Sequence, residues 1–139
     1  AKGRTSLLDD VPLGLPGLAR AVKLQKRAAT VGFDWTEIGD VLNKLEEETR
    51  ELAEAAAARA PDAIEDEFGD LLFVLANVAR HLKIDPEAAI RRANGKFERR
   101  FRHIEARLAA AGRRPEDASL AEMEELWVEA KKGERAGAP

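Results

Sequence analysis

The sequence predicts an all-α fold, and three observations support this prediction. Apolar residues recur at spacings of three and four along most of the 139 residues, which is the period of a helix with one buried face. No stretch alternates apolar and polar residues as a strand would, and β-branched residues are few. Because 45% of the residues are hydrophobic, the chain also has enough apolar surface for one core of ordinary size.

The first helix is predicted over residues 18–31, after an N-terminal arm of residues 1–17. The arm contains too many glycines and prolines for regular structure. Gly32 is suited to end the helix, because glycine readily adopts the left-handed conformation found at helix ends. After a short link, either Asp34 or Thr36 could cap the second helix.

The second and third helices are predicted to fold back as a hairpin around residues 59–62. Pro61 cannot continue a helix, and Asp62 followed by Glu65 resembles a capping signal for the next one. Each helix carries an apolar stripe that should face the core. The stripes consist of Ile38, Val41, Leu42, Leu45, Thr49, Leu52 and Ala56, and of Ile64, Phe68, Leu71, Leu75, Val78 and Leu82.

The fourth helix is predicted to begin at Asp85 and Pro86, with the aspartate as its cap, and to end at Gly112. Its apolar seam is interrupted by Asn94. This asparagine is either a core amide that sets the register of packing or a contact to a ligand. The cations near it could bind phosphate or simply cover the outside of the helix. They are Lys96, Arg99, Arg100 and Arg102.

A final short helix is predicted after Ser119, which forms a capping box with Glu122. The tail of residues 133–139 is predicted to be disordered. Residues 18–132 then form a single domain.

Two pairs of carboxylates are placed symmetrically about the predicted hairpin turn. Glu48 and Glu51 share one face of the second helix, and Glu67 and Asp70 share one face of the third. Glu51 and Glu67 would each lie roughly 12 Å from the turn, so the pairs face each other. Converging carboxylates repel one another unless a cation lies between them, and oxygen ligands of this kind suit Mg²⁺. The alternative is a solvated acidic surface.

Other properties exclude several classes of protein. The chain has no cysteine, so disulfides and thiolate metal sites are excluded, and its two histidines, His81 and His103, are too far apart for a histidine site. A net charge of −3 gives no support for general nucleic-acid binding. No apolar run is long enough to span a membrane, and no signal-peptide pattern opens the chain. We therefore expect a soluble cytoplasmic protein, although its first residue, Ala1, leaves open a processed start or a fragment.

With these residues placed, the sequence strongly resembles the MazG family of nucleoside triphosphate pyrophosphohydrolases, over about residues 6–131. The resemblance rests on two acidic motifs, EExxE (Glu47, Glu48 and Glu51) and ExxD (Glu67 and Asp70), and on four further stretches. These are Leu24-Gln25-Lys26-Arg27-Ala28, Val31-Gly32-Phe33-Asp34-Trp35, Gly69-Asp70-Leu71-Leu72-Phe73 and Asn94-Gly95-Lys96-Phe97-Glu98-Arg99-Arg100-Phe101. It implies an all-α fold of helical hairpins that resembles a four-helix bundle and is completed by dimerisation. Many members carry two such domains, and residues 6–9 resemble the start of the second.

The same resemblance implies hydrolysis of a nucleoside triphosphate to the monophosphate and pyrophosphate with Mg²⁺, for which Mn²⁺ could substitute. The metal ligands would be Glu48, Glu51, Glu67 and Asp70, and Glu47 would join the metal site or orient water. The candidates for substrate contacts are Asn94, Lys96, Arg100, Trp127 and Lys131. Trp127 could instead belong to the core, and Trp35 could pack the link between helices. The expected assembly is a homodimer or a higher homo-oligomer.

Two other classes of function remain as alternatives. Carboxylate-bridged di-iron proteins also use Glu-rich helical bundles, but they normally add a Glu-x-x-His motif, which this sequence lacks. A non-enzymatic dimerisation or regulatory module would carry the same acids only as surface charge. In that case their replacement by alanine would leave function intact.

Overall fold

The computed structural model describes residues 5–137, and within them every regular element is a helix. The predicted all-α class is therefore confirmed. The elements are α1 (Gly17–Ala29), α2 (Ile38–Ala58), α3 (Pro61–His81), α4 (Pro86–Ala110), the single-turn η1 (Pro115–Asp117) and α5 (Leu120–Ala136). Among the described residues, no helix is both long and apolar enough to cross a membrane.

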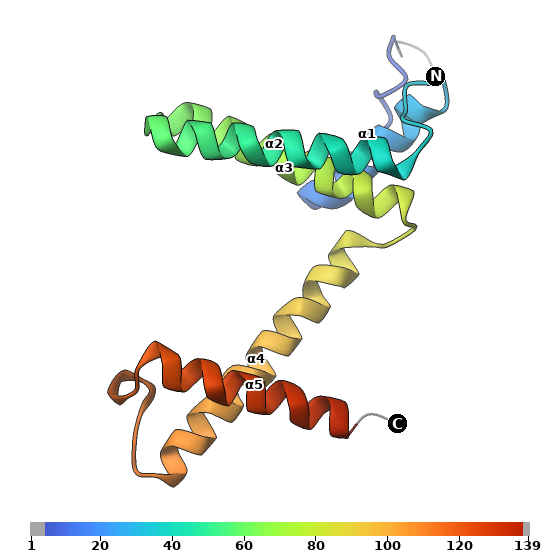
Figure 1. Cartoon of the computed structure of the whole chain (residues 1–139). Helices are drawn as coiled ribbons and strands as arrows, with labels where there is room; N and C mark the ends of the chain where they lie inside the picture. Colours follow the sequence, from blue (N-terminus) through green and yellow to red (C-terminus); the bar gives the residue numbers. More distant parts are fainter. Residues whose placement is uncertain (1–4, 138–139) are drawn as a thin grey trace. The chain divides into compact units, whose positions relative to one another are not determined.

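The chain divides into two compact units, residues 1–89 and 90–139. In the first unit α2 and α3 lie side by side as a hairpin, and α1 packs against α3 (Figure 1). The core of this unit is made of small side chains, with Val41 fully buried and Val74, Ala76 and Ala79 nearly so. Because small side chains allow the helix axes to approach closely, polar residues at the edge of the stripes also become buried.

The hairpin turn lies where the sequence predicts it. Arg59 ends α2 in the left-handed conformation, with φ of 53°, and Pro61 occupies the first turn of α3. The predicted cap at Asp62 is wrong, since Ala60 is the N-cap residue and no side chain caps the helix. Because Pro61 already starts the helix, Asp62 falls in its first turn, where its charge still favours the helix dipole.

The link between α1 and α2 also differs from the prediction. Helix α1 ends at Ala29, and Gly32 follows with φ of +88°. Neither Asp34 nor Thr36 caps α2, whose N-cap residue is Glu37 without a side-chain hydrogen bond. Asp34 is unavailable as a cap because its carboxylate is bound by Arg80 of α3.

The predicted apolar stripe of α3 is only partly buried. Phe68, Leu75 and Leu82 remain 49%, 42% and 50% exposed in this chain. Helix α3 contacts α2 on one side and α1 on another, so its buried sector is set by both neighbours. That sector contains Val74, Ala76, Asn77 and Ala79, none of which belongs to the stripe predicted from the sequence, so the predicted buried face of α3 is wrong for the single chain.

The second unit contains most of α4 together with η1 and α5. Ile104 and Leu108 of α4 and Ala130 of α5 are its buried apolar side chains. The predicted capping box is confirmed, since Ser119 Oγ accepts a hydrogen bond of 3.1 Å from the backbone N–H of Glu122. Helix α5 continues through Ala136, so the tail predicted from residue 133 is helical up to that point. Gly133 does not end α5, because one glycine inside a helix costs only about 1 kcal/mol of stability and the surrounding Lys, Glu and Arg residues favour the helical conformation.

Parts of the predicted arm and tail lie outside the described residues, namely 1–4 and 138–139. The described part of the arm forms turns and lies against α1. Val11 is buried, and Arg20 Nε donates a hydrogen bond of 3.2 Å to the carbonyl of Pro12.

Candidate functional site

Three carboxylates from α2 and α3 come together in the first unit. Each of Glu48, Glu67 and Asp70 offers an oxygen, and these oxygens all lie within 4.8 Å of one another. Glu48 is only 5% exposed, although it is an acid. Its Oε2 atom and the Oε2 atom of Glu67 are buried without a hydrogen-bond partner among the described residues. Buried carboxylate oxygens without partners are costly, so this cluster calls for a positively charged occupant.

Glu51 lies beside this cluster through Glu67. Desolvation, followed by a hydrogen bond with Glu51 and repulsion from Glu51, Glu48 and Asp70, raises the pKa of Glu67 to about 7. The pKa of Asp70 is also raised, first by desolvation and then by repulsion from Asp66 and Glu48. The two pairs inferred from sequence spacing are thus close in space, and their role as metal ligands stays a prediction.

Lys44 supplies a positive charge at the edge of the cluster. Its Nζ atom lies 3.3 Å from Glu47 Oε2 and 3.4 Å from Glu48 Oε1. Hydrogen bonds to these two carboxylates raise the pKa of Lys44, with Glu47 the stronger cause. The predicted catalytic residue Glu47 therefore lies next to the cluster and bonds to Lys44. The sequence analysis assigned no role to Lys44.

The chemistry of these donors fits a hard divalent cation. All of them are carboxylate oxygens, which Mg²⁺ and similar ions prefer, and the acids come from two facing helices. The cluster contains no histidine among the described residues, so it lacks the mixed ligand set of a di-iron centre. A divalent ion would also remove the repulsion that raises the pKa of Glu67.

The predicted substrate contacts belong to the second unit, where two of them meet. The guanidinium carbon of Arg100 lies 5.2 Å from the centre of the Trp127 ring. Phe97 packs against the same tryptophan, with ring centres 5.6 Å apart. Arg100 also donates hydrogen bonds of 2.9 and 3.2 Å to Glu134, so any phosphate bound by it would compete with this carboxylate.

The other three predicted contacts, Asn94, Lys96 and Lys131, are exposed. Exposure of Asn94 means that it is not a core amide in this chain. Lys96 lies close enough to Glu134 to help lower the pKa of that acid, after the larger effects of Arg100 and Arg99. Lys96 and Arg100 of α4 and Trp127 of α5 thus lie in the same region of the second unit.

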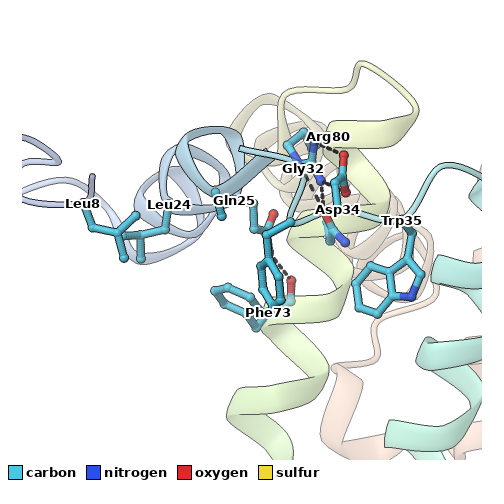
Figure 2. Close-up of a pocket in the computed structure, with 11 residues that line it drawn as sticks. Leu8, Leu24, Gln25, Gly32, Asp34, Trp35, Phe73 and Arg80 are labelled. Carbon is cyan, nitrogen blue, oxygen red and sulfur yellow. Dashed lines mark hydrogen bonds and ion pairs between the residues drawn. The ribbon is translucent and has the colours of Figure 1, made fainter. Parts of the chain in front are cut away.

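The first unit also contains an apolar pocket that the sequence did not predict. It has a volume of about 580 Å³ and lies between α1, the link after it, and α3 (Figure 2). It is lined by Leu8, Leu24, Gln25, Ala28, Gly32, Phe33, Asp34, Trp35, Phe73, Asn77 and Arg80. The available signals were a glutamine on the apolar side of the first helix and two aromatic residues in a short link.

An ion-pair network forms the polar edge of this pocket. Arg80 Nη1 donates a hydrogen bond of 3.1 Å to Asp34 Oδ2, and Nη2 binds the other oxygen. His81 Nε2 lies 3.0 Å from Asp34 Oδ1. The hydrogen bond from Arg80, followed by that from His81, outweighs desolvation and lowers the pKa of Asp34. His81 thus holds the link between α1 and α2 through Asp34.

Comparison with known proteins gives a consistent result. Residues 39–105 match the MazG nucleotide pyrophosphohydrolase domain. The chain is 47% identical over 135 residues to the nucleoside triphosphate pyrophosphohydrolase of Escherichia coli K12, covering 96% of this chain and 51% of that protein. It is 38% identical over 133 residues to the nucleoside triphosphate pyrophosphohydrolase/pyrophosphatase MazG of Thermotoga maritima, covering 96% and 51%.

A third relative is the Bacillus subtilis protein YabN, with 48% identity over 133 residues, which cover 94% of this chain and 27% of that protein. The chain thus spans about half the length of the first two relatives and a smaller share of the third.

Proposed function

Because the chain belongs to the MazG family, we propose that it hydrolyses nucleoside triphosphates to the monophosphate and pyrophosphate with Mg²⁺, which Mn²⁺ could replace. The observation that carries this proposal is the cluster of Glu48, Glu67 and Asp70, with two buried oxygens that have no hydrogen-bond partner among the described residues. A pyrophosphohydrolase reaction concentrates negative charge on phosphate oxygens, and the cluster supplies a place to hold the countercharge.

When bound, Mg²⁺ would neutralise the triphosphate, lower the pKa of a water and stabilise pyrophosphate as it leaves. Glu48, Glu67, Asp70 and Glu51 would hold it. Because the pKa of Glu67 is about 7 in the free protein, this carboxyl must lose its proton before it can act as a ligand. Lys44 keeps the carboxylate of Glu48 in place through their 3.4 Å ion pair.

Glu47 is the candidate base for the attacking water. Its side chain is 47% exposed and bonds only to Lys44 among the described residues, so solvent reaches it. Arg100 and Lys96 would bind phosphate oxygens, with Arg100 exchanging Glu134 for the substrate. Lys131, one turn after Trp127, and Asn94 are exposed and available for further contacts.

We also propose that the protein forms a homodimer. Phe68, Leu75 and Leu82 of α3 are large apolar side chains that are about half exposed in the single chain. Exposed apolar side chains of this kind mark interfaces between proteins. Burying them against a second copy would extend the hairpin of α2 and α3 into a bundle of four helices. Light scattering coupled to size exclusion should give twice the mass of the chain.

The experiment for the activity is turnover of a panel of ribo- and deoxynucleoside triphosphates, with and without Mg²⁺, with products separated by anion exchange. We expect monophosphate and pyrophosphate only with the metal. Glu51→Ala should abolish turnover while circular dichroism shows the fold retained. The matched control is Glu54→Ala, an exposed acid one turn further along α2, which should keep full activity.

Three outcomes would contradict the proposal. Diphosphate and phosphate as products would exclude the proposed bond cleavage. An active Glu51→Ala variant would remove this acid from the site. No turnover of any nucleotide would favour the non-enzymatic dimerisation module.

A further inference from the structure

Glu134 of α5 binds the cations of α4 that are candidates for phosphate binding. Its Oε2 atom accepts hydrogen bonds of 2.9 and 3.2 Å from Nη2 and Nε of Arg100. Its Oε1 atom lies 3.8 Å from Nε of Arg99. The hydrogen bonds from Arg100, and then the charges of Arg99 and Lys96, lower the pKa of Glu134. One carboxylate is therefore shared by three cations.

A carboxylate held in this way takes the positions that phosphate oxygens would occupy. A guanidinium group binds carboxylates and phosphates through the same pair of parallel N–H donors. The side chain of Arg100 is only 12% exposed, and its guanidinium carbon also lies 5.2 Å from the centre of the Trp127 ring. Arg100 is thus held in one place between α4 and α5. A phosphate that binds Arg100 there has to displace Glu134.

The position of Glu134 in its own helix is unfavourable. The C-terminal end of a helix carries a partial negative charge, so an acid in the last turn is repelled by the helix dipole. Glu134 lies in the last turn of α5, which ends at Ala136. Helix stability therefore does not account for this acid, whereas its contacts with the cations of α4 do. Conflicts of this kind between a residue and its own element are typical of functional sites.

The residue before Glu134 weakens the same turn. Gly133 lies inside α5, and a Cβ atom added there would meet nothing within 4 Å, so packing does not require a glycine. Its φ does not lie in the left-handed region either. A glycine inside a helix is unfavourable compared with alanine, and helix ends fray most readily. The turn that carries Glu134 can therefore unwind at low cost.

We propose that Glu134 is an internal competitor of the substrate. In the free protein it holds the phosphate-binding cations of α4, and it leaves them when a phosphate chain binds, as the last turn of α5 unwinds. The carboxylate carries one negative charge and a polyphosphate carries several, so the polyphosphate is attracted more strongly to the same cations. Glu134 thus lowers the affinity for the substrate and, by returning to Arg100, favours release of the product. The inference rests on the proposed function, because that proposal assigns these cations to the phosphates.

Binding of inorganic tripolyphosphate in EDTA measures this competition without metal or hydrolysis. Isothermal titration calorimetry gives the affinity. Glu134→Gln keeps the shape of the side chain and removes its charge, and we expect it to bind about fivefold more tightly, the effect of losing one competing ion pair. The matched control is Glu129→Gln, which should bind like the native protein. Glu129 also joins α5 to α4, through contacts of 2.9 Å with His103 and with Arg107.

Two further variants test how Glu134 acts. In a protein that carries Arg100→Ala, adding Glu134→Gln should change the affinity less than it does in the native protein, because the main contact of the acid is already lost. Gly133→Ala should weaken tripolyphosphate binding about threefold, because a more stable last turn keeps Glu134 on the cations.

Four results would overturn the proposal. Weaker binding by Glu134→Gln would show that the carboxylate positions Arg100 for phosphate and does not compete with it. An equal gain in Glu134→Gln and Glu129→Gln would make the effect one of net charge alone. Unchanged affinity in Gly133→Ala would refute release by unwinding. Absence of tripolyphosphate binding in every protein would mean that these cations bind no phosphate chain.

Failure of this inference is distinguishable from failure of the proposed function. If the protein hydrolyses triphosphates and Glu134→Gln leaves KM unchanged, the competition is refuted and the activity stands. If Glu134→Gln binds tripolyphosphate more tightly but no nucleotide is hydrolysed, the competition stands and the activity fails. If both proposals are right, Glu134→Gln lowers KM for the triphosphate by about the same factor as it raises the affinity for tripolyphosphate.

Discussion

Metal binding by the acidic cluster should release protons, because Glu67 holds one in the free protein. With its pKa at about 7, Glu67 is about half protonated at pH 7, about nine-tenths at pH 6 and about one-tenth at pH 8. A carboxyl must be ionised to act as a ligand. We therefore expect Mg²⁺ to release from Glu67 about 0.9 proton per ion at pH 6, about 0.5 at pH 7 and about 0.1 at pH 8.

The assay is calorimetric titration of Mg²⁺ at each pH in buffers of different ionisation enthalpy, from which the number of released protons follows. Asp70, whose pKa is also raised, can add to the release at the lowest pH. Glu67→Gln should remove the proton release at pH 7 and most of it at pH 6, whereas Glu65→Gln, which changes an exposed acid on the same helix, should not. Tight binding of Mg²⁺ with no proton release at pH 6 and 7 would refute the reasoning.

The raised pKa of Glu67 also predicts how the stability of the metal-free protein changes with pH. The folded state holds the Glu67 proton more tightly than the unfolded state, whose carboxyl has a pKa near 4.5. Stability should therefore fall as the pH rises from about 4.5 to about 7 and should then level off. Urea denaturation in EDTA across this range checks the prediction. Glu67→Gln should flatten the profile, and a profile that rises through this window in the native protein but not in the variant would contradict it.

Three further predictions concern stability and can be checked by urea denaturation at fixed protein concentration. Asp34→Ala should cost about 2–3 kcal/mol at pH 7, because it leaves Arg80 without its bidentate partner. The cost should be smaller at pH 3, because the carboxyl of the unfolded state, with a pKa of 3.8, is then largely protonated and the folded state, in which the pKa is lower, gains less from the ion pair; an equal cost at both pH values would argue against the ion pair. Gly112→Ala should destabilise by about 1 kcal/mol because φ is +71°, whereas Gly133→Ala, in a helix with open space, should stabilise by about 0.5–1 kcal/mol; equal signs would be unexpected. Ser119→Ala should cost about 1 kcal/mol through loss of the α5 cap, and Ser119→Asp should restore it.

The acidic site was largely visible in the sequence because it is local. Helical spacing puts Glu48 beside Glu51 and Glu67 beside Asp70, and a proline-marked turn sets the two pairs opposite each other. What the sequence could not give is the burial of Glu48 or the exclusion of Glu51 from the tightest group of three. Those depend on how closely the two helices approach.

The caps were predicted less well than the helices. Asp34, Thr36 and Asp62 all have the right side chain for a cap, yet none of them caps a helix. A short polar side chain bonds to whichever group the tertiary structure brings near, and for Asp34 that group is Arg80, 46 residues away in the chain. Ser119 does cap as predicted, since its partner Glu122 is only three residues away.

The sequence by itself thus determined the helices, the hairpin and the pairing of the acids, since each follows from the helical period and from residues a few positions apart. Only the tertiary structure decided which face of α3 is buried and that Gln25 and Asn77 form a pocket with the aromatic residues of the link. Both depend on the packing of α1 against α3, which brings together residues about fifty positions apart. Periodicity within one helix carries no information about such contacts.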